Sequence, residues 1–549
     1  MSSSSGIDRP DKASQPLQNK PWRAPILWLL LPGIAGYVGA HFVELPSIWV
    51  TLCPALLLLS AVCLPLHRHK VWHIAFPAAV GLLAWSWTTH QSIEFPSIWD
   101  QLPPREVTVA GRIEQTYAGT VYPERAYAIV LIVTPPALSP ELKGQKLFAS
   151  LRQGADDITV RPHAKVSLQG VLVPVLNTED DFGEFLESRE INFQLRQGTL
   201  VQELDPPHQA QHWINSLRVQ WKEWLSASPP EFASEGGLLA AVILGERAFL
   251  LAGAMHLFAV SGLHVMIVGL TLDQLLKLLQ LSFFRRRFIT LLFVGLYVAV
   301  IGFSPSAMRA FSILAFYCLA SLLPRPAKPM RVILASGLLT LAVSPAQLYS
   351  IGFQLSYSVV ISIITFGLPL IELIQNRWPS YRLSIEADLS GLHRFLRWLK
   401  RKLIESLCIS FSATMGSAPL IILHFELWTP GAIVLNAFLV PIATAVVACG
   451  VVIILTHSVG LGFIAILATY PAWLLISFME RLSFTAIRIP GFYSDVRWHS
   501  SSWAYFAIIT FLCLLLLSPK KESAYVRTLY LGSVSIALLS VVLVGTQPI

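Results

Sequence analysis

Long apolar segments recur along this chain and restrict its fold more than any other feature. Each is close to the roughly 20 residues that an α-helix needs to cross the hydrocarbon core of a bilayer. Hydrophobic residues make up 54% of the 549 residues and charged residues only 13%, too few charges to cover so much apolar surface in water. The pattern predicts a mainly α, polytopic transmembrane helical bundle of about 13 spans. Three spans are expected at 24–43, 46–66 and 71–90, and ten at 255–278, 287–303, 307–323, 330–347, 350–374, 405–425, 430–456, 460–478, 502–518 and 525–545.

Basic clusters lie between these apolar segments and predict the orientation of the chain. Lysine and arginine are enriched in the cytoplasmic loops of membrane proteins. With a cytoplasmic N-terminus, every basic cluster falls on the cytoplasmic side, and the polar residues 1–23 form a cytoplasmic tail. The same placement accounts for the net charge of +8 without nucleic acid. The clusters are His67–Lys70, Arg285–Arg287, Arg325–Arg331, Arg394–Lys402 and Lys520–Lys521.

A segment of different character interrupts the apolar pattern after the three N-terminal spans of 24–90. Residues 104–205 contain short β-rich runs separated by glycine, proline and charged residues, which predicts a small OB-like β domain. The orientation above makes this domain extracytoplasmic. Its charge does not favour DNA binding, because 104–175 has eight basic and six acidic residues and 176–205 has two and eight. The expected strands are Val107–Ile113, Tyr127–Val133, Leu147–Leu151 and Val166–Val173.

Two further segments have amphipathic helical patterns. Within 206–254, tryptophan and leucine recur at helical spacing, which favours a helix in the outer membrane interface. A second pattern at 392–403 combines apolar residues with arginine and lysine and suits the inner surface. Anchoring in lipid headgroups is the expected role of both. The apolar residues are Trp213, Ile214, Leu217, Trp221, Trp224 and Leu225 in the first, and Leu392, Phe395, Leu396, Leu399 and Leu403 in the second.

A polar motif stands near the start of the span expected at 255–278. It reads HLFAVSGLH from His256 to His264. Polar side chains are costly in lipid and usually face a bundle interior or a water-filled path. Ser261 and His264 are three residues apart, so they project within about 60° of each other on a helix. We expect this face to point inward.

This motif is similar to the HL-x-A-x-SGLH stretch of the ComEC-type competence protein family. The resemblance continues in the same order through several further segments, which makes it more specific than any one segment alone. At Phe182–Phe193 the match is looser, since Glu190 stands where the family usually has glycine. The other matching segments are Leu238–Arg247 (LLAAVILGER), Ser304–Ala310 (SPSAMRA), Ser344–Ser356 (SPAQLYSIGFQLS) and Asn436–Pro441 (NAFLVP).

The resemblance implies a channel in the bacterial inner membrane that admits one strand of DNA while the other is degraded. Residues 255–549 would then be the channel core, and single-stranded DNA its substrate. It also implies a DNA receptor, a nuclease or a cytoplasmic motor of the competence machinery as partners, and a homo-oligomer is possible. The residues expected on the DNA path are Ser261, His264, Arg309, Gln354, Ser358 and Asn436, and the motif residues are His256, Gly262, Gly352, Phe353, Ser356 and Pro441.

No metal or catalytic site is expected from this sequence. Many family members carry a C-terminal metallo-β-lactamase-like domain with an H-x-H-x-D-H motif, and we expect this chain to be a short form without it. The one H-x-H, at His67–His69, lies in a basic loop without further ligands at suitable spacing. The six cysteines form neither a zinc pattern nor a disulfide framework. We therefore predict no cofactor and no enzymatic activity.

Polar stripes on two spans and one arginine add to the channel prediction independently of the resemblance. Ser350, Gln354, Ser358 and Ser362 recur every four residues, and a second set runs from Ser406 to Ser417. The alternative for such stripes is close helix packing, in which small residues let helices approach. Gln354 favours an aqueous path, because a buried amide needs several partners. Arg309 could meet a passing phosphate, or it could be an ordinary interfacial arginine.

Two other functions are compatible with parts of the sequence. A secondary transporter for a small solute would also have polar stripes and interrupted helices. The chain, however, has no second copy of the SGLH or GFQLS segments, as an inverted repeat could supply. A membrane hydrolase would need clustered carboxylates or an activated nucleophile. The nearest such feature, Glu246 beside Arg247, has the pattern of an ion pair at a helix end.

Overall fold

The computed structural model is described in two separate units, residues 1–90 and 91–549. The described residues are 27–43, 48–63, 72–91, 104–118, 125–136, 139–152, 164–175, 186, 191–205, 209–227, 233–245, 262–322, 328–377, 391–500, 502–507, 510, 542 and 545–548.

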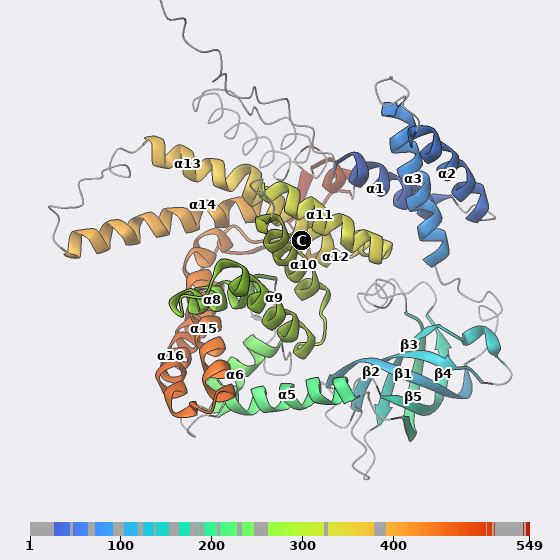
Figure 1. The fold of residues 1–549 in the computed structure, drawn as a ribbon, viewed down its shortest axis with the longest axis horizontal. Helices are drawn as coiled ribbons and strands as arrows, with labels where there is room; N and C mark the ends of the chain where they lie inside the picture. The colour runs from blue at the N-terminus through green and yellow to red at the C-terminus, as the bar shows by residue number, and fades with distance from the viewer. Residues whose placement is uncertain are drawn as a thin grey trace, which may run out of the picture. The chain divides into compact units, whose positions relative to one another are not determined.

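The first unit contains the helices α1 (Leu27–Phe42), α2 (Ile48–Cys63) and α3 (Trp72–Gln91) (Figure 1). They lie at the positions of the three predicted N-terminal spans, and α1 and α2 are shorter than expected with 16 residues each, whereas α3 has 20. A hydrogen bond of 2.6 Å joins the buried hydroxyls of Thr51 and Ser86 between α2 and α3. Gly36 of α1 lies so close to α3 that an added Cβ would be 2.0 Å from the carbonyl oxygen of Gly81. Small residues therefore allow these helices to pack closely.

The second unit begins with a closed five-stranded β-barrel whose strand order is β1-β2-β3-β5-β4. Neighbouring strands are antiparallel except for β3 and β5, which are parallel. Buried positions alternate along β4, as expected when one face of each strand points into a core. The strands are β1 (Arg105–Ala118), β2 (Arg125–Thr134), β3 (Lys146–Arg152), β4 (Lys165–Pro174) and β5 (Ile191–Asp205), with a 3-10 turn, η2 (Pro140–Leu142), between β2 and β3.

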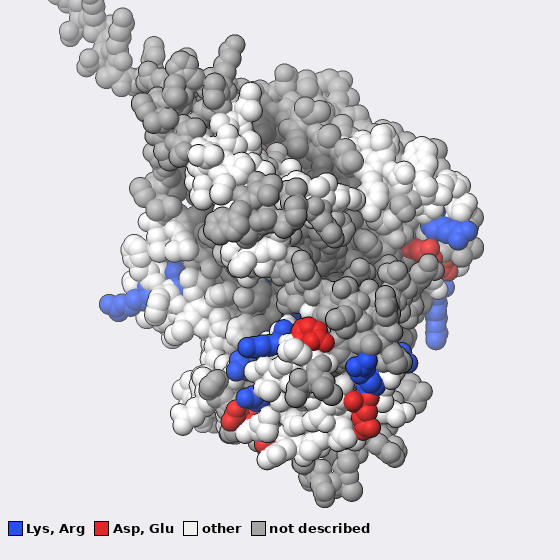
Figure 2. Space-filling view, turned by 90° about the vertical axis from the view of Figure 1, so that its right-hand side faces the viewer, with Lys and Arg blue, Asp and Glu red and all other residues white. Residues whose placement is uncertain are grey.

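The barrel confirms the four strands expected from the sequence and adds one. The fifth, β5, begins at the end of the loosely matching segment Phe182–Phe193, in the acidic part of the predicted β domain. Its N-terminal part alternates between buried and half-buried residues, but the glutamates before it obscure this pattern. On the face that Figure 2 shows, the basic and acidic side chains of the described residues are interspersed.

The rest of the second unit is helical. Its main hydrophobic core is formed by α5, α6, α8, α9, α10, α15 and α16. The helices are α5 (Gln209–Ser226), α6 (Ala233–Leu244), α8 (Gly262–Leu278), α9 (Phe283–Val300), α10 (Pro305–Leu322), α11 (Pro329–Val343), η5 (Pro345–Tyr349), α12 (Ile351–Ser362), the π-helical η6 (Ile363–Gly367), α13 (Leu368–Arg377), α14 (Gly391–Phe425), α15 (Ala432–Ser458) and α16 (Gly462–Ile487).

The predicted count of about 13 spans is not supported. Within the described residues, five helices are long and apolar enough to cross a membrane. Others are shorter or carry more charge: α11 has 15 residues, and α9 has three arginines in its first turns. The two last predicted spans fall mostly outside the described residues. The five helices are Pro305–Leu322, Ile351–Gln375, Leu392–Phe425, Ala432–Ser458 and Gly462–Ala486.

Helices α5 and α6 pack into the core, whereas the sequence pattern favoured a position in the membrane interface. Trp221 and Leu225 of α5 are at most 2% exposed, and the Trp221 ring stacks on Phe293 of α9. Each residue from Leu239 to Leu244 of α6 is at most 1% exposed. A helix that is apolar on all sides is typical of a core rather than of an interface. The apolar face of α5 is thus covered by protein over its C-terminal half.

A small second sheet of order β6-β7-β8 joins three distant loops. It contains β6 (Leu427–Trp428), β7 (Ser494–Trp498) and β8 (Thr546–Pro548). Trp498 is 7% exposed, and its indole donates a hydrogen bond of 3.3 Å to the carbonyl of Pro419. The predicted topology puts all three of these loops on the extracytoplasmic side, so the pairing is compatible with it.

Candidate functional site

Three of the sequence segments singled out above meet at the N-terminal ends of α8, α10 and α12. A Cβ added to Gly262, the first residue of α8, would lie 3.3 Å from the Cβ of Ala310 and 3.6 Å from the carbonyl oxygen of Ser306, both on α10. Arg309 of α10 reaches Gly352, the second residue of α12. The SGLH, SPSAMRA and SIGFQLS segments are therefore neighbours in space.

Arg309 is the charged residue at the centre of this junction. It is 5% exposed, and its Nη2 donates hydrogen bonds to the Gly352 carbonyl at 3.0 Å and to the Ser356 hydroxyl at 3.1 Å. Its Nε is buried and has no partner among the described residues. No carboxylate contacts the guanidinium in the described part of the chain, and both of its hydrogen-bond acceptors there are uncharged oxygens. The interfacial alternative has the arginine side chain extending outward to water. In the structure this side chain is buried instead.

Glycine at position 352 leaves room for this approach. A Cβ there would be 3.3 Å from Arg309 Nη2, tighter than ordinary contact. Beside it, the Phe353 ring lies 4.5 Å from the Tyr357 ring and is 8% exposed. Within five residues of α12, the motif thus provides a backbone acceptor at Gly352, a buried aromatic ring at Phe353 and a hydroxyl acceptor at Ser356.

A hydroxyl network extends from the same junction, and sequence reasoning missed it. Ser312 of α10 contacts Ser336 of α11 at 2.5 Å, and Ser336 contacts Tyr357 of α12 at 2.9 Å. Thr340 is 3.3 Å from the Tyr357 hydroxyl. Ser336 is completely buried. The available signal was a polar side chain within an apolar run, which in membrane helices often marks a pairing between helices.

The predicted polar stripe of α12 is divided between two environments. Ser350 caps the helix by accepting from the Phe353 amide at 3.3 Å, and the Gln354 amide donates to the Leu348 carbonyl at 3.1 Å. Ser358 and Ser362, by contrast, donate to the carbonyls of Gly416 and Ser412 on α14.

The contacts of Ser358 and Ser362, in the C-terminal half of the stripe, are those of close helix packing. A Cβ on Gly416 would be 2.6 Å from the Cβ of Ser362, so glycine is needed for this approach. In the second set, Ser406 likewise donates to the Ala437 carbonyl of α15 at 3.1 Å. The assignment of Gln354 and Ser358 to a DNA path stays a prediction.

The remaining candidate residues are placed less closely together. His264 is 3% exposed in the first turn of α8. Asn436 is half-buried and Pro441 is exposed on α15, and no hydrogen bond between described residues joins Asn436 to Arg309. His256 and Ser261 lie outside the described residues.

The arrangement is suited to binding an anion. Three helix N-termini carry partial positive charge, and Arg309 adds a full charge. Ser304 and Ser350 cap two of these helices, since each accepts a hydrogen bond from a backbone amide of the first turn. Within the described part of the chain, no three His, Cys, Asp or Glu residues are grouped as metal ligands.

Comparison with known proteins identifies the family. The model of the competence protein family matches residues 245–522, about half of the chain, and includes the junction of α8, α10 and α12. ComE operon protein 3 of Bacillus subtilis (strain 168) is 26% identical over 357 residues, which cover 62% of this chain and 42% of that protein. An uncharacterized protein of Aquifex aeolicus (strain VF5) is 30% identical over 212 residues, 38% of this chain and 43% of that protein. No solved structure matches.

Apolar helices long enough to cross a bilayer, packed around buried polar side chains, define the class as a helical integral membrane protein. Within that class the chain belongs to the ComEC-type competence protein family, as the motif segments predicted. The aligned part covers less than half the length of each of these two relatives.

Proposed function

We propose that this protein functions in DNA uptake as a channel that passes single-stranded DNA across the bacterial inner membrane during natural transformation. The observation that carries the proposal is the junction of α8, α10 and α12, where Arg309 lies among three helix N-termini. A DNA strand carries one negative charge per phosphate. Helix N-termini and a desolvated guanidinium attract such groups.

Orientation supports the same proposal. In the topology predicted from the basic clusters, α8, α10 and α12 all begin on the extracytoplasmic side. Their positive ends would then face incoming DNA. We propose that this junction is the outer mouth of the path, that Gln354 lies on the path near it, and that Ser358 and Ser362 serve mainly to pack α12 against α14.

We also propose an extracytoplasmic role for the barrel. Its five strands, with order β1-β2-β3-β5-β4 and a parallel β3–β5 pair, support an OB-like assignment. Its mixed surface charge favours weak contact with DNA rather than a tight clamp. We propose that a DNA receptor, a separate nuclease and a cytoplasmic motor supply capture, strand degradation and force, and that this chain is itself not an enzyme.

The test is the substitution Arg309→Gln in the host, with DNA measured separately in the outer compartment and in the cytoplasm. Burying a cation costs several kcal/mol, which offsets the two hydrogen bonds that it makes. We therefore expect normal protein abundance but entry into the cytoplasm at least about tenfold lower, equivalent to about 1.4 kcal/mol on the limiting step. DNA should still accumulate outside the cytoplasmic membrane.

Two control variants make the result specific. Met308→Leu changes the neighbouring residue, which is 43% exposed, and should have no effect. Arg309→Lys keeps the charge but cannot bridge Gly352 and Ser356 with a planar guanidinium, so its defect should be intermediate. Normal uptake by Arg309→Gln at wild-type abundance would exclude this junction from the DNA path. A deletion strain with normal DNA entry but lost uptake of a small solute would instead establish a transporter.

A further inference from the structure

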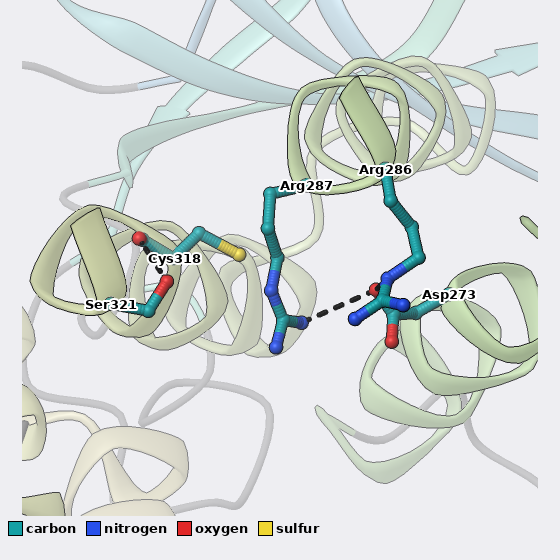
Figure 3. Close-up of polar contacts among 5 residues, drawn as sticks. All are labelled: Asp273, Arg286, Arg287, Cys318 and Ser321. Atoms are coloured by element: carbon teal, nitrogen blue, oxygen red, sulfur yellow. Dashed lines mark hydrogen bonds and ion pairs between the residues drawn. The ribbon is translucent and has the colours of Figure 1, made fainter. Parts of the chain in front are cut away.

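The turn between α8 and α9 carries a concentration of charge that the proposed channel does not use. Residues 273–287 contain one carboxylate, Asp273, and four cations, giving a net charge of +3. Asp273 is 7% exposed and binds two arginines with one oxygen (Figure 3), Arg286 Nε at 2.8 Å and Arg287 Nη1 at 3.4 Å. The other two cations, Lys277 and Arg285, are exposed.

Two aromatic rings contact the paired arginines of the cluster. The Phe283 ring centroid lies 5.8 Å from the guanidinium carbon of Arg286 and 5.2 Å from that of Arg287. The Tyr317 ring of α10 lies 5.4 Å from Arg287. These contacts hold the two partly buried arginines in place without neutralising them, since one carboxylate balances only one of the two charges. Arg287 Nε is buried and has no partner among the described residues.

Large apolar side chains surround the exposed cations. Phe284, Phe288 and Leu292 follow one another at four-residue spacing on one face of α9 and are 67%, 69% and 65% exposed. Leu278 and Leu279 at the turn are 78% and 71% exposed. A continuous exposed apolar stripe on a membrane protein is typical of a lipid-facing surface. The stripe begins beside Arg285. The cations could therefore contact a phospholipid headgroup while the apolar side chains contact its acyl chains.

We propose that the α8–α9 turn binds an acidic phospholipid, with the headgroup phosphate at Lys277 and Arg285 and the acyl chains along Phe284, Phe288 and Leu292. The net charge of +3 favours an anionic headgroup over a zwitterionic one. Nucleic acid is disfavoured as the occupant, because its phosphate backbone would leave the apolar stripe uncovered. The Asp273 cluster fixes the turn that presents the two exposed cations.

Native mass spectrometry of the purified full chain tests this proposal. The probes are phosphatidylglycerol and phosphatidylcholine with identical acyl chains, and the measured quantity is the affinity for retained lipid. The wild type should bind phosphatidylglycerol at least tenfold more tightly. Each cation near an acidic lipid contributes ~1 kcal/mol, about fivefold in affinity, so Lys277→Gln/Arg285→Gln should lose about 25-fold for phosphatidylglycerol. Its affinity for phosphatidylcholine should change by less than about twofold.

The matched control is Lys328→Gln/Arg331→Gln, which removes two exposed cations at the start of α11. There the following residues, Val332 to Leu334, are at most 7% exposed, so no apolar stripe adjoins them. This variant should keep the full preference for phosphatidylglycerol. Equal losses in both double variants, or none in Lys277→Gln/Arg285→Gln, would overturn the proposal. So would a single-stranded oligonucleotide or inorganic phosphate that binds in a manner dependent on Lys277 and Arg285 while lipid preference is absent.

Discussion

Removing the charge of Asp273 should destabilise the helical unit strongly. The isosteric change Asp273→Asn leaves Arg286 and Arg287 buried with no counter-charge, since their side chains are each 15% exposed. With an effective dielectric constant near 20, the Coulomb attraction between Asp273 and each arginine is roughly 5–6 kcal/mol before the cost of desolvation is subtracted. Breaking a buried pair by removing one partner costs about 3–5 kcal/mol. We expect the lower end of this range, because the arginines keep some contact with solvent.

The measurement is thermal unfolding of the purified protein in detergent, followed by tryptophan fluorescence. A loss of ~3 kcal/mol corresponds to a midpoint lowered by roughly 6 °C or more, on the scaling of soluble domains. Gln274→Asn, at the exposed neighbouring position, is the control and should leave the midpoint unchanged. Adding Arg287→Gln to Asp273→Asn should recover part of the loss, because it removes one of the two uncompensated charges.

The result that would refute this reasoning is an unfolding midpoint for Asp273→Asn within about 1 °C of the wild type, on a scale where 1 kcal/mol shifts it by a few degrees. The cluster would then contribute no net stability, and the α8–α9 turn would be held by apolar packing alone.

Four further outcomes are expected. Gln354→Leu should insert normally but lower cytoplasmic DNA entry at least about tenfold, whereas Leu355→Ala should have little effect; normal transformation by the first would reduce the stripe to helix packing. Gly416→Ala should lower the unfolding midpoint, since its Cβ would lie 2.6 Å from that of Ser362, and an unchanged midpoint would mean that α12 and α14 separate easily. Cysteine at Arg125 should react with a membrane-impermeant thiol reagent in intact cells, and protection would reverse the predicted topology. Purified protein should not cleave DNA with magnesium, manganese or zinc; metal-dependent cleavage would make it an enzyme.

Several structural features could be predicted because they depend on local pattern. Short β-rich runs predicted β1 to β4, and the observed strands extend at most five residues beyond the predicted ends. Apolar runs predicted the helices but not the number of spans, since composition does not distinguish a helix surrounded by lipid from one surrounded by protein. The short helix α6 illustrates this, because it is apolar and each residue from Leu239 to Leu244 is at most 1% exposed within the protein.

Proline and glycine had consequences that depended on their position. Pro305 begins α10, where its missing amide costs nothing. Pro441, by contrast, lies within α15, which continues through it. Gly352 and Gly416 are explained by the side chains that approach them, and neither has a special backbone angle.

By itself the sequence determined that this is a membrane protein and that a β domain interrupts its helices. It also identified Arg309 and the SGLH and SIGFQLS segments as unusually polar for a membrane environment. Helical and strand periodicity specify which face of an element is polar, and the cost of polar groups in lipid specifies which residues need partners. Only the tertiary structure shows which residues are the hydrogen-bond partners of these polar side chains. Arg309 bonds to residues 43 and 47 positions away, and Ser312 reaches Tyr357 through Ser336 of a third helix. Periodicity carries no information about which helix faces which, because that choice depends on how whole surfaces pack together.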